Sequence, residues 1–123
     1  MQEAEYRRVF ESMKLDKAQA LLISAAPEND AQRRLIVDLA DQARLRAIYP
    51  FRDYVGLGGL MAYSVDITDL FRRMAGYTDL IFKGANPGEM PIYQATKFEL
   101  VINLKTARAL GLTVPPTLLA RGD

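Results

Sequence analysis

Four short apolar runs, separated by stretches with helical periodicity, constrain the fold of this chain more than any other feature. The runs lie at residues 18–24, 46–50, 60–64 and 98–103. A continuous apolar run of this length is typical of a strand that is covered on both faces of a parallel sheet. Between the runs, apolar residues recur at intervals of three and four, as they do in amphipathic helices. The alternation predicts an α/β fold, with a mostly parallel open sheet flanked by helices.

The helical stretches have recognisable ends. Residues 2–14 form the first predicted helix, and Asn29 with Gln32 has the spacing of a capping box for the second. One or two helical turns are expected within residues 51–59, where glycine ends them. Asp66 and Asn103 are the predicted N-caps of the last two helices. Residues 1–123 together have the length of a single α/β domain.

Composition excludes several classes of function. Sixteen basic residues balance fifteen acidic ones, so a net charge of +1 gives no electrostatic reason to expect nucleic-acid binding. The absence of cysteine and histidine removes disulfides, catalytic triads and most zinc sites, and we expect neither a metal nor a cofactor. No apolar run approaches the ~20 residues of a transmembrane helix, and no signal-peptide core follows the charged first residues. As written, the chain is therefore predicted to be cytoplasmic.

Candidate binding residues lie after the predicted strands, because ligands of open parallel sheets sit beyond the carboxyl ends of the strands. Aromatic side chains there offer faces for stacking on an organic ligand, and an arginine offers a forked pair of donors for a carboxylate. Hydroxyl and amide groups complete the set. The candidate ligand-binding residues are Ser24, Pro27, Asn29, Tyr49, Phe51, Arg52, Tyr63 and Ser64. Asn103 is the fourth strand end expected at this edge.

Structural explanations compete with these assignments. Asn29 also suits a helix cap, Tyr49 suits core packing, and Arg52 suits a surface ion pair. The pair Asp66 and Asp69, like the arginine pairs on predicted helices, is interpreted as solvated surface. The glycines at 56–59 do not have the spacing of a dinucleotide fingerprint. Because no base accompanies the two serines, an enzyme on this sheet is poorly supported, and we predict that the protein is not one.

A family resemblance is carried by three stretches, "GGLMAYS", "KGANPGEMP" and "TKFELVINLKTARALGLTVPPTLLAR". With the upstream "AQALLISAAPENDAQRR", they cover nearly the whole chain. The chain resembles the C-terminal part of ABC transporter substrate-binding proteins related to the tryptophan/tyrosine-type solute receptors, which have the periplasmic-binding-protein type 1 fold.

The resemblance implies a two-lobed receptor that closes on a small organic solute, such as an amino acid, and docks on an ABC permease. Residues 1–123 would be its C-terminal lobe, and the loops at Ser24–Asn29, Tyr49–Arg52 and Tyr63–Ser64 would line the cleft. An intact family member would be periplasmic, or membrane-anchored outside the cytoplasm. The family has a signal peptide and a first lobe ahead of this region.

Two expectations follow from a lone lobe. A micromolar ligand binds with ~8 kcal/mol, and losing half of the contacts leaves ~4 kcal/mol, which is near-millimolar affinity. The apolar stripe from Ile67 to Phe82 would lack its usual cover, so a homodimer is predicted, with exchange of elements as an option. The alternative to a solute-binding role is a self-associating structural protein that is a remnant of such a receptor.

Overall fold

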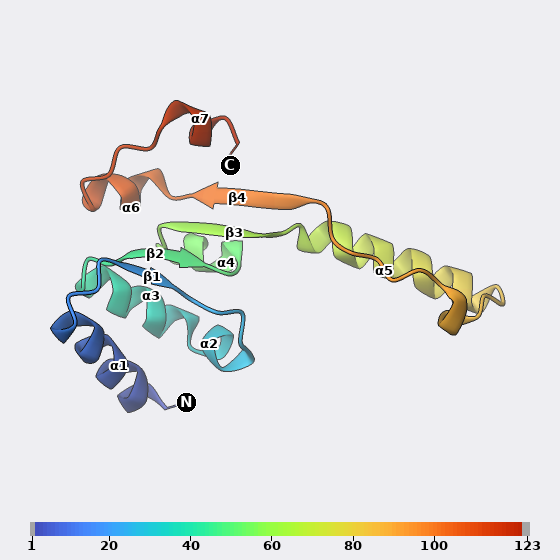
Figure 1. Cartoon of the computed structure of the whole chain (residues 1–123), viewed down its shortest axis with the longest axis horizontal. Coiled ribbons are helices and arrows are strands. Elements are labelled where there is room, and N and C mark those ends of the chain that lie inside the picture. Colours follow the sequence, from blue (N-terminus) through green and yellow to red (C-terminus); the bar gives the residue numbers. More distant parts are fainter. Residues whose placement is uncertain (1, 122–123) are drawn as a thin grey trace. The chain divides into compact units, whose positions relative to one another are not determined.

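The computed structural model describes residues 2–121, which form two compact units. One unit comprises the residues up to Ser64 together with those from Leu100 onward, and the other comprises Val65–Glu99. Figure 1 labels the elements. The helices are α1 (Glu3–Leu15), α2 (Pro27–Ala31), α3 (Arg33–Gln42), α4 (Arg52–Gly56), α5 (Ile67–Phe82), α6 (Leu104–Ala109) and α7 (Pro116–Leu119), with a 3-10 turn at Pro87–Glu89. The strands are β1 (Ala20–Leu22), β2 (Arg46–Tyr49), β3 (Met61–Val65) and β4 (Phe98–Ile102).

The sheet confirms the predicted α/β class. Its strands are ordered β1-β2-β3-β4, and β1, β2 and β3 are parallel to one another. In register, Leu22 lies opposite Ile48, and Ile48 lies opposite Met61. The prediction that a single domain spans residues 1–123 stays a prediction.

One face of the sheet carries the core of the first unit. Apolar side chains of α1 and α3, including Phe10, Ile36 and Ala40, pack against Ala47 and Ala62 of the strands. The periodicity that predicts these helices is thus explained by the face that they bury. The prediction that residues 18–24 form a strand covered on both faces is wrong in one respect: β1 is an edge strand, and Ala20 and Leu22 are exposed.

The second helical region begins earlier than its sequence pattern suggests. Pro27 is the first residue of α2, where its fixed φ suits a helix start, and Ala26 takes the N-cap position. Asn29 therefore lies inside α2 and is not a cap. A kink at Gln32 separates α2 from α3, and Gln32 is the N-cap residue of α3.

The fourth strand runs against the third. Asp66 N donates to Lys97 O at one end of the pair, and Asn103 N donates to Leu60 O at the other, which is the pattern of an antiparallel pair (Figure 1). Asn103 caps α6 as predicted, accepting from Thr106 N at 3.0 Å. The prediction that Asn103 lies at the carboxyl edge of the sheet is wrong, however. Because β4 is antiparallel to β3, Asn103 lies beside the amino end of β3.

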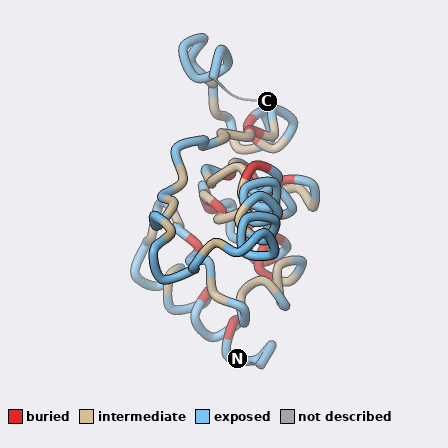
Figure 2. The backbone as a smooth tube through the Cα atoms, turned by 90° about the vertical axis from the view of Figure 1, so that its right-hand side faces the viewer, coloured by how far each residue is buried: buried red, intermediate tan, exposed pale blue. Residues whose placement is uncertain are grey.

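The second unit is a long helix with an extended segment bound along it. Asp66 caps α5 as predicted, accepting from Asp69 N at 3.0 Å. Residues 91–97 return along the helix, where Tyr77 Oη donates to Pro91 O and Lys97 Nζ lies 3.4 Å from Asp69 Oδ1. In Figure 2, α5 is mostly pale blue, that is, exposed.

The interpretation of Asp69 as solvated surface is wrong. Its side chain is 8% exposed and pairs with Arg73, whose Nε lies 3.0 Å from Oδ2. The Arg73 guanidinium also lies over the ring of Tyr93, 4.1 Å from its centroid. The hydrogen bond from Arg73, with help from Lys97, lowers the pKa of Asp69 although burial opposes the shift.

Candidate functional site

The carboxyl ends of β1, β2 and β3 form one edge of the sheet, because these strands are parallel and in register. Extending the register by two residues places Ser24, Pro50 and Tyr63 level with one another across the three strands. This is the edge where ligands of open parallel sheets bind. The structure therefore brings most of the predicted residues to one side of the first unit.

Ser24 and Asn29 form a hydrogen-bonded cluster at the end of β1. Asn29 Nδ2 donates to both the carbonyl and the Oγ of Ser24, each at 3.1 Å. Tyr6, 23 residues away on α1, donates from its hydroxyl to Asn29 Oδ1 at 2.9 Å. Burial, together with the charge of Glu28, raises the pKa of Tyr6, so its hydroxyl remains a neutral donor. Asn29 thus connects α1, α2 and β1.

Tyr6 belongs to this cluster, although the sequence analysis did not single it out. A hollow of about 210 Å³ lies beside it, between α1 and β1. The cluster supplies its polar wall, and apolar side chains supply the rest: Val9, Phe10, Met13, Leu21, Leu22, Ile23 and Ile36. Such a hollow has room for a small apolar group with one polar end.

Tyr49 does not face this edge. It is 2% exposed, and its ring stacks on that of Tyr54 with centroids 5.1 Å apart. Burial raises the pKa of Tyr49 far above its ordinary value, which is expected of a phenol inside the core. The packing interpretation of this residue therefore accounts for its position.

The remaining candidates lie at the starts of α2 and α4 and on β3. Phe51 is the N-cap residue of α4 and packs partly against the core, whereas Arg52 begins that helix and is exposed. On β3, Tyr63 is exposed and Ser64 is half-buried. Pro27, exposed at the start of α2, lies on the loop that follows Ser24. The edge thus combines one guanidinium, one exposed aromatic ring and several hydroxyl groups.

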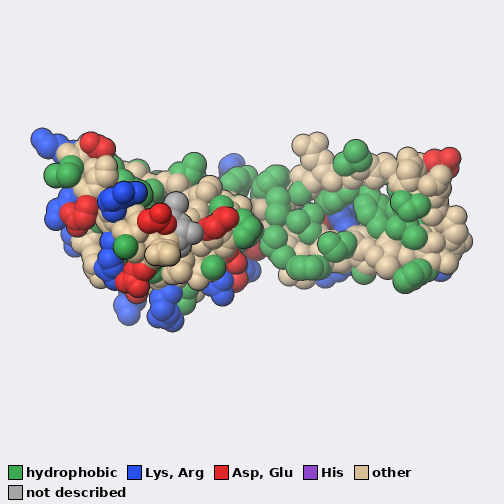
Figure 3. Space-filling view, turned by 90° about the horizontal axis from the view of Figure 1, so that it is seen from below, with side chains coloured by type: hydrophobic (Ala, Val, Ile, Leu, Met, Phe, Trp, Pro, Cys, Tyr) green, Lys and Arg blue, Asp and Glu red, His purple; other side chains and the backbone are tan. Residues whose placement is uncertain are grey.

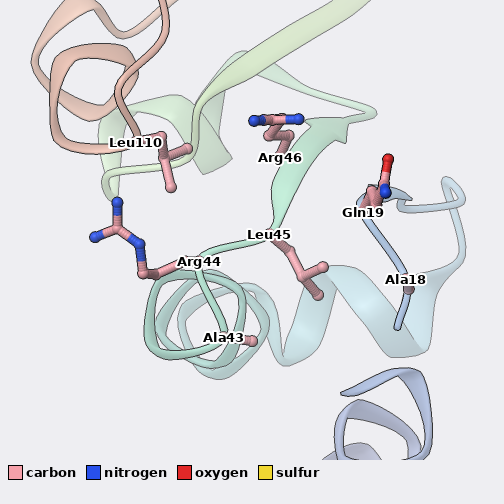
Figure 4. A pocket seen from close by; sticks show the side chains of 7 residues that line it. All are labelled: Ala18, Gln19, Ala43, Arg44, Leu45, Arg46 and Leu110. Carbon is pink, nitrogen blue, oxygen red and sulfur yellow. The ribbon is translucent and has the colours of Figure 1, made fainter. Parts of the chain in front are cut away.

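A larger hollow, of about 430 Å³, lies at the opposite edge of the sheet (Figure 4). It is lined by Ala18, Gln19, Ala43, Arg44, Leu45, Arg46 and Leu110. These residues follow the C-terminal ends of α1, α3 and α6, whose partial negative charge opposes anion binding. Arg44 already donates from Nη2 to Ala109 O at 3.1 Å. Arg44 is thus explained as the partner of the C-terminal end of α6.

Within residues 2–121, no group of three or more acidic, histidine or cysteine side chains has the arrangement of a metal site. No helix in that range has the length and hydropathy needed to cross a bilayer.

Comparison with protein families decides where the chain belongs. The family described as "ABC transporter substrate binding protein" matches residues 4–123. The chain belongs to this family. No curated protein matches this chain.

Three solved structures share its fold. A conserved domain protein from Vibrio cholerae is 23% identical with a TM-score of 0.85, and an ABC domain from Streptococcus pneumoniae in complex with L-Trp is 22% identical with a TM-score of 0.87. Each is matched over 98% of this chain and 40% of its own length. A ligand-free, open substrate-binding protein with adhesive properties from Clostridium difficile is 16% identical with a TM-score of 0.68, over 94% of this chain and 39% of its own. This family member thus spans less than half the length of the solved structures that it matches.

Proposed function

We propose that this chain is part of the solute-binding component of an ABC importer, in which it forms the C-terminal lobe. The observation that carries the proposal is the family match over residues 4–123. In this proposal the solute is a small organic molecule such as an amino acid, held at the carboxyl edge between this lobe and another. The protein works outside the cytoplasm and delivers the solute to an ABC permease.

The chemistry of the carboxyl edge supports an amino acid as the solute. The exposed guanidinium of Arg52 suits a carboxylate, and the exposed ring of Tyr63 suits an aromatic or aliphatic side chain. Ser24, Asn29, Phe51 and Ser64 lie at or after the carboxyl ends of the same three strands. The complex of the Streptococcus relative with L-Trp points to the same class of ligand.

Titration of the chain with L-tryptophan, and with a panel of other amino acids, tests the proposal. Backbone NMR shifts detect weak binding, which is expected near the millimolar range because one lobe supplies only part of the contacts. We expect shifts confined to residues 24–29, 50–52 and 63–64. Arg52→Ala should abolish them, whereas Arg8→Ala, an exposed arginine on α1, should not.

Two results would contradict this function. The first is the absence of any shift at about 10 mM of every amino acid tested, since a site with half the contacts retains about 4 kcal/mol. The second is a set of shifts that Arg52→Ala leaves unchanged. The alternative, a self-associating structural protein with no solute, predicts that all titrations stay flat.

A further inference from the structure

The start of α6 binds the far end of the helix that carries Arg52. Thr106, in the first turn of α6, donates from Oγ1 to Gly58 O at 2.8 Å. Asn103, the N-cap residue of α6, donates from Nδ2 to Val55 O at 3.4 Å. Each bond joins residues 48 positions apart in the chain. An N-cap residue serves its own helix, so these bonds to α4 are additional to capping. We call Asn103 and Thr106 the α6 brace.

The side chain of Asn103 has one orientation that serves both helices. Its Oδ1 accepts from Thr106 N at 3.0 Å, and a backbone N–H acts only as a donor. Val55 O acts only as an acceptor, so the amide nitrogen of Asn103 must face it. An aspartate at this position would keep the cap, but it would have no proton to donate to Val55 O. Capping of α6 and bracing of α4 can therefore be separated by one substitution.

Helix α4 is too short to hold its own conformation. It has five residues, and an isolated helix of that length is unstable in water unless tertiary contacts fix it. Tyr54 and Val55, in its second half, are buried in the core. Arg52, its first residue, is exposed. The direction of the helix axis therefore determines where the Arg52 side chain begins, and contacts at the buried end of α4 set that direction.

The brace acts where α4 ends and carbonyl groups need partners. The last carbonyls of a helix have no acceptor role within it. Gly58 has a φ of +109°, which turns the chain out of the helix, and Gly58 N donates to Val55 O at 3.0 Å. Asn103 adds a second donor to Val55 O, and Thr106 supplies the donor to Gly58 O. The brace thus binds both ends of the turn that closes α4.

We propose that Asn103 and Thr106 are positioning residues for the solute edge: by fixing the end of α4, they fix the direction in which Phe51 and Arg52 are presented. This inference rests on the proposed function, in which Arg52 binds the carboxylate of the solute. Asn103 lies beside the amino end of β3, at the opposite edge of the sheet from the proposed solute site. The brace therefore affects solute binding through α4 and not by contact with the solute.

NMR spectra of the solute-free chain test the positioning. Thr106→Val has nearly the same shape and lacks the hydroxyl, so amide signals should move at Phe51 and Arg52 as well as at residues 55–58. Thr106→Ser keeps the hydroxyl and should restore the signals of Phe51 and Arg52. Chemical shifts of a folded chain do not depend on its free energy of unfolding, so lost stability alone would not move them. Changes confined to residues 55–58 and α6 would overturn the proposal.

Asn103→Asp separates the brace from the cap, because aspartate is an equally good N-cap residue. It should move the same two signals at the start of α4, and by less than Thr106→Val does, since the bond to Val55 O is the longer one. Unmoved signals would show that Asn103 is a cap alone, and the proposal would be wrong for this residue. Thr78→Val is the matched control. It removes a hydroxyl that donates to Met74 O within α5, and it should leave the start of α4 unchanged.

Titration with L-tryptophan distinguishes this inference from the proposed function. We expect Thr106→Val to weaken binding about fivefold, the effect of one hydrogen bond of ordinary strength, and Thr106→Ser to restore it. If the wild type binds and Thr106→Val binds equally well, the positioning role is wrong and the proposed function stands. If the wild type binds no amino acid, the proposed function is wrong, and the positioning role is refuted with it.

Discussion

Gly59 provides a sharp test of how the core supports the carboxyl edge. A Cβ at this position would lie 2.8 Å from Tyr49 Cε2, 2.8 Å from Tyr54 O and 2.9 Å from Tyr49 Cδ2. The rings of Tyr49 and Tyr54 stack on each other in the core, and the two residues flank the loop that carries Phe51 and Arg52. Because both rings are packed in this way, they have little room to move away from an added Cβ. Gly59→Ala should therefore disturb the core and this loop together.

The magnitude follows from the contacts. To reach ordinary contact at 3.4 Å the neighbours must move by about 0.6 Å, and one of them is a backbone carbonyl. Overpacking of this kind costs about 1–3 kcal/mol, and we expect the upper half of that range because Tyr54 is fully buried. The alanine also restricts the conformations of the unfolded chain, which offsets about 0.5–1 kcal/mol of this cost. The net loss is about 2 kcal/mol, or roughly 8 °C in Tm.

Urea denaturation followed by circular dichroism measures the change, and an unchanged m-value shows that the unfolded state is comparable. Gly56→Ala is the matched control, because a Cβ at the end of α4 would meet nothing within 4 Å. That variant should gain about 0.5–1 kcal/mol. If Gly59→Ala were as stable as Gly56→Ala, the packing argument for this edge would be wrong.

Two further substitutions probe buried polar groups. The hydroxyl of Tyr54 is buried and has no hydrogen-bond partner among residues 2–121, so Tyr54→Phe should raise the free energy of unfolding by about 1–2 kcal/mol in urea titrations, and a loss of stability would contradict this reasoning. The pKa of Asp69 is lowered in the folded chain. The folding stability that the Asp69 carboxylate contributes is therefore fully present above the ordinary pKa of 3.8, and it is lost as the pH falls through the pKa of the folded chain. NMR signals of Tyr93 should therefore report release of the segment 91–97 on acidification, and Asp69→Asn should flatten that transition; an equally steep transition in the variant would show that another group drives it.

Local chemistry was readable from the sequence, and long-range contacts were not. Asp66 and Asn103 were predicted as caps because a cap involves only the next three residues. Asn29 has the same cap chemistry, but its side chain serves Ser24 and Tyr6, the second of which is 23 residues distant. Likewise, Asp69 is buried by the return of a segment that ends 28 residues later, at Lys97.

The sequence predicted that the strand ends carrying the candidate residues share one edge of the sheet, but it did not predict how each side chain is oriented there. The parallel order of β1, β2 and β3 follows from their alternation with helices, and it fixes where their carboxyl ends lie. Tyr49 was misplaced because the burial of a strand residue depends on its parity: Ala47 and Tyr49 face the core, whereas Arg46 and Ile48 do not. The direction of β4 depends on the path of the whole second unit, which no local pattern specifies.

Helix α5 shows why the two units cannot be explained by the same energetics. In the first unit, apolar burial against the sheet holds the helices in place. In α5, the stabilising contacts include a cap at Asp66, ion pairs of Asp69 with Arg73 and of Asp79 with Lys83, and the polar contacts with segment 91–97. An exposed i,i+4 pair contributes only about 0.3–0.5 kcal/mol, and a 16-residue helix with little apolar packing is marginal in water. A surface that covers the exposed apolar side chains of α5 (Figure 3) would therefore stabilise the helix itself.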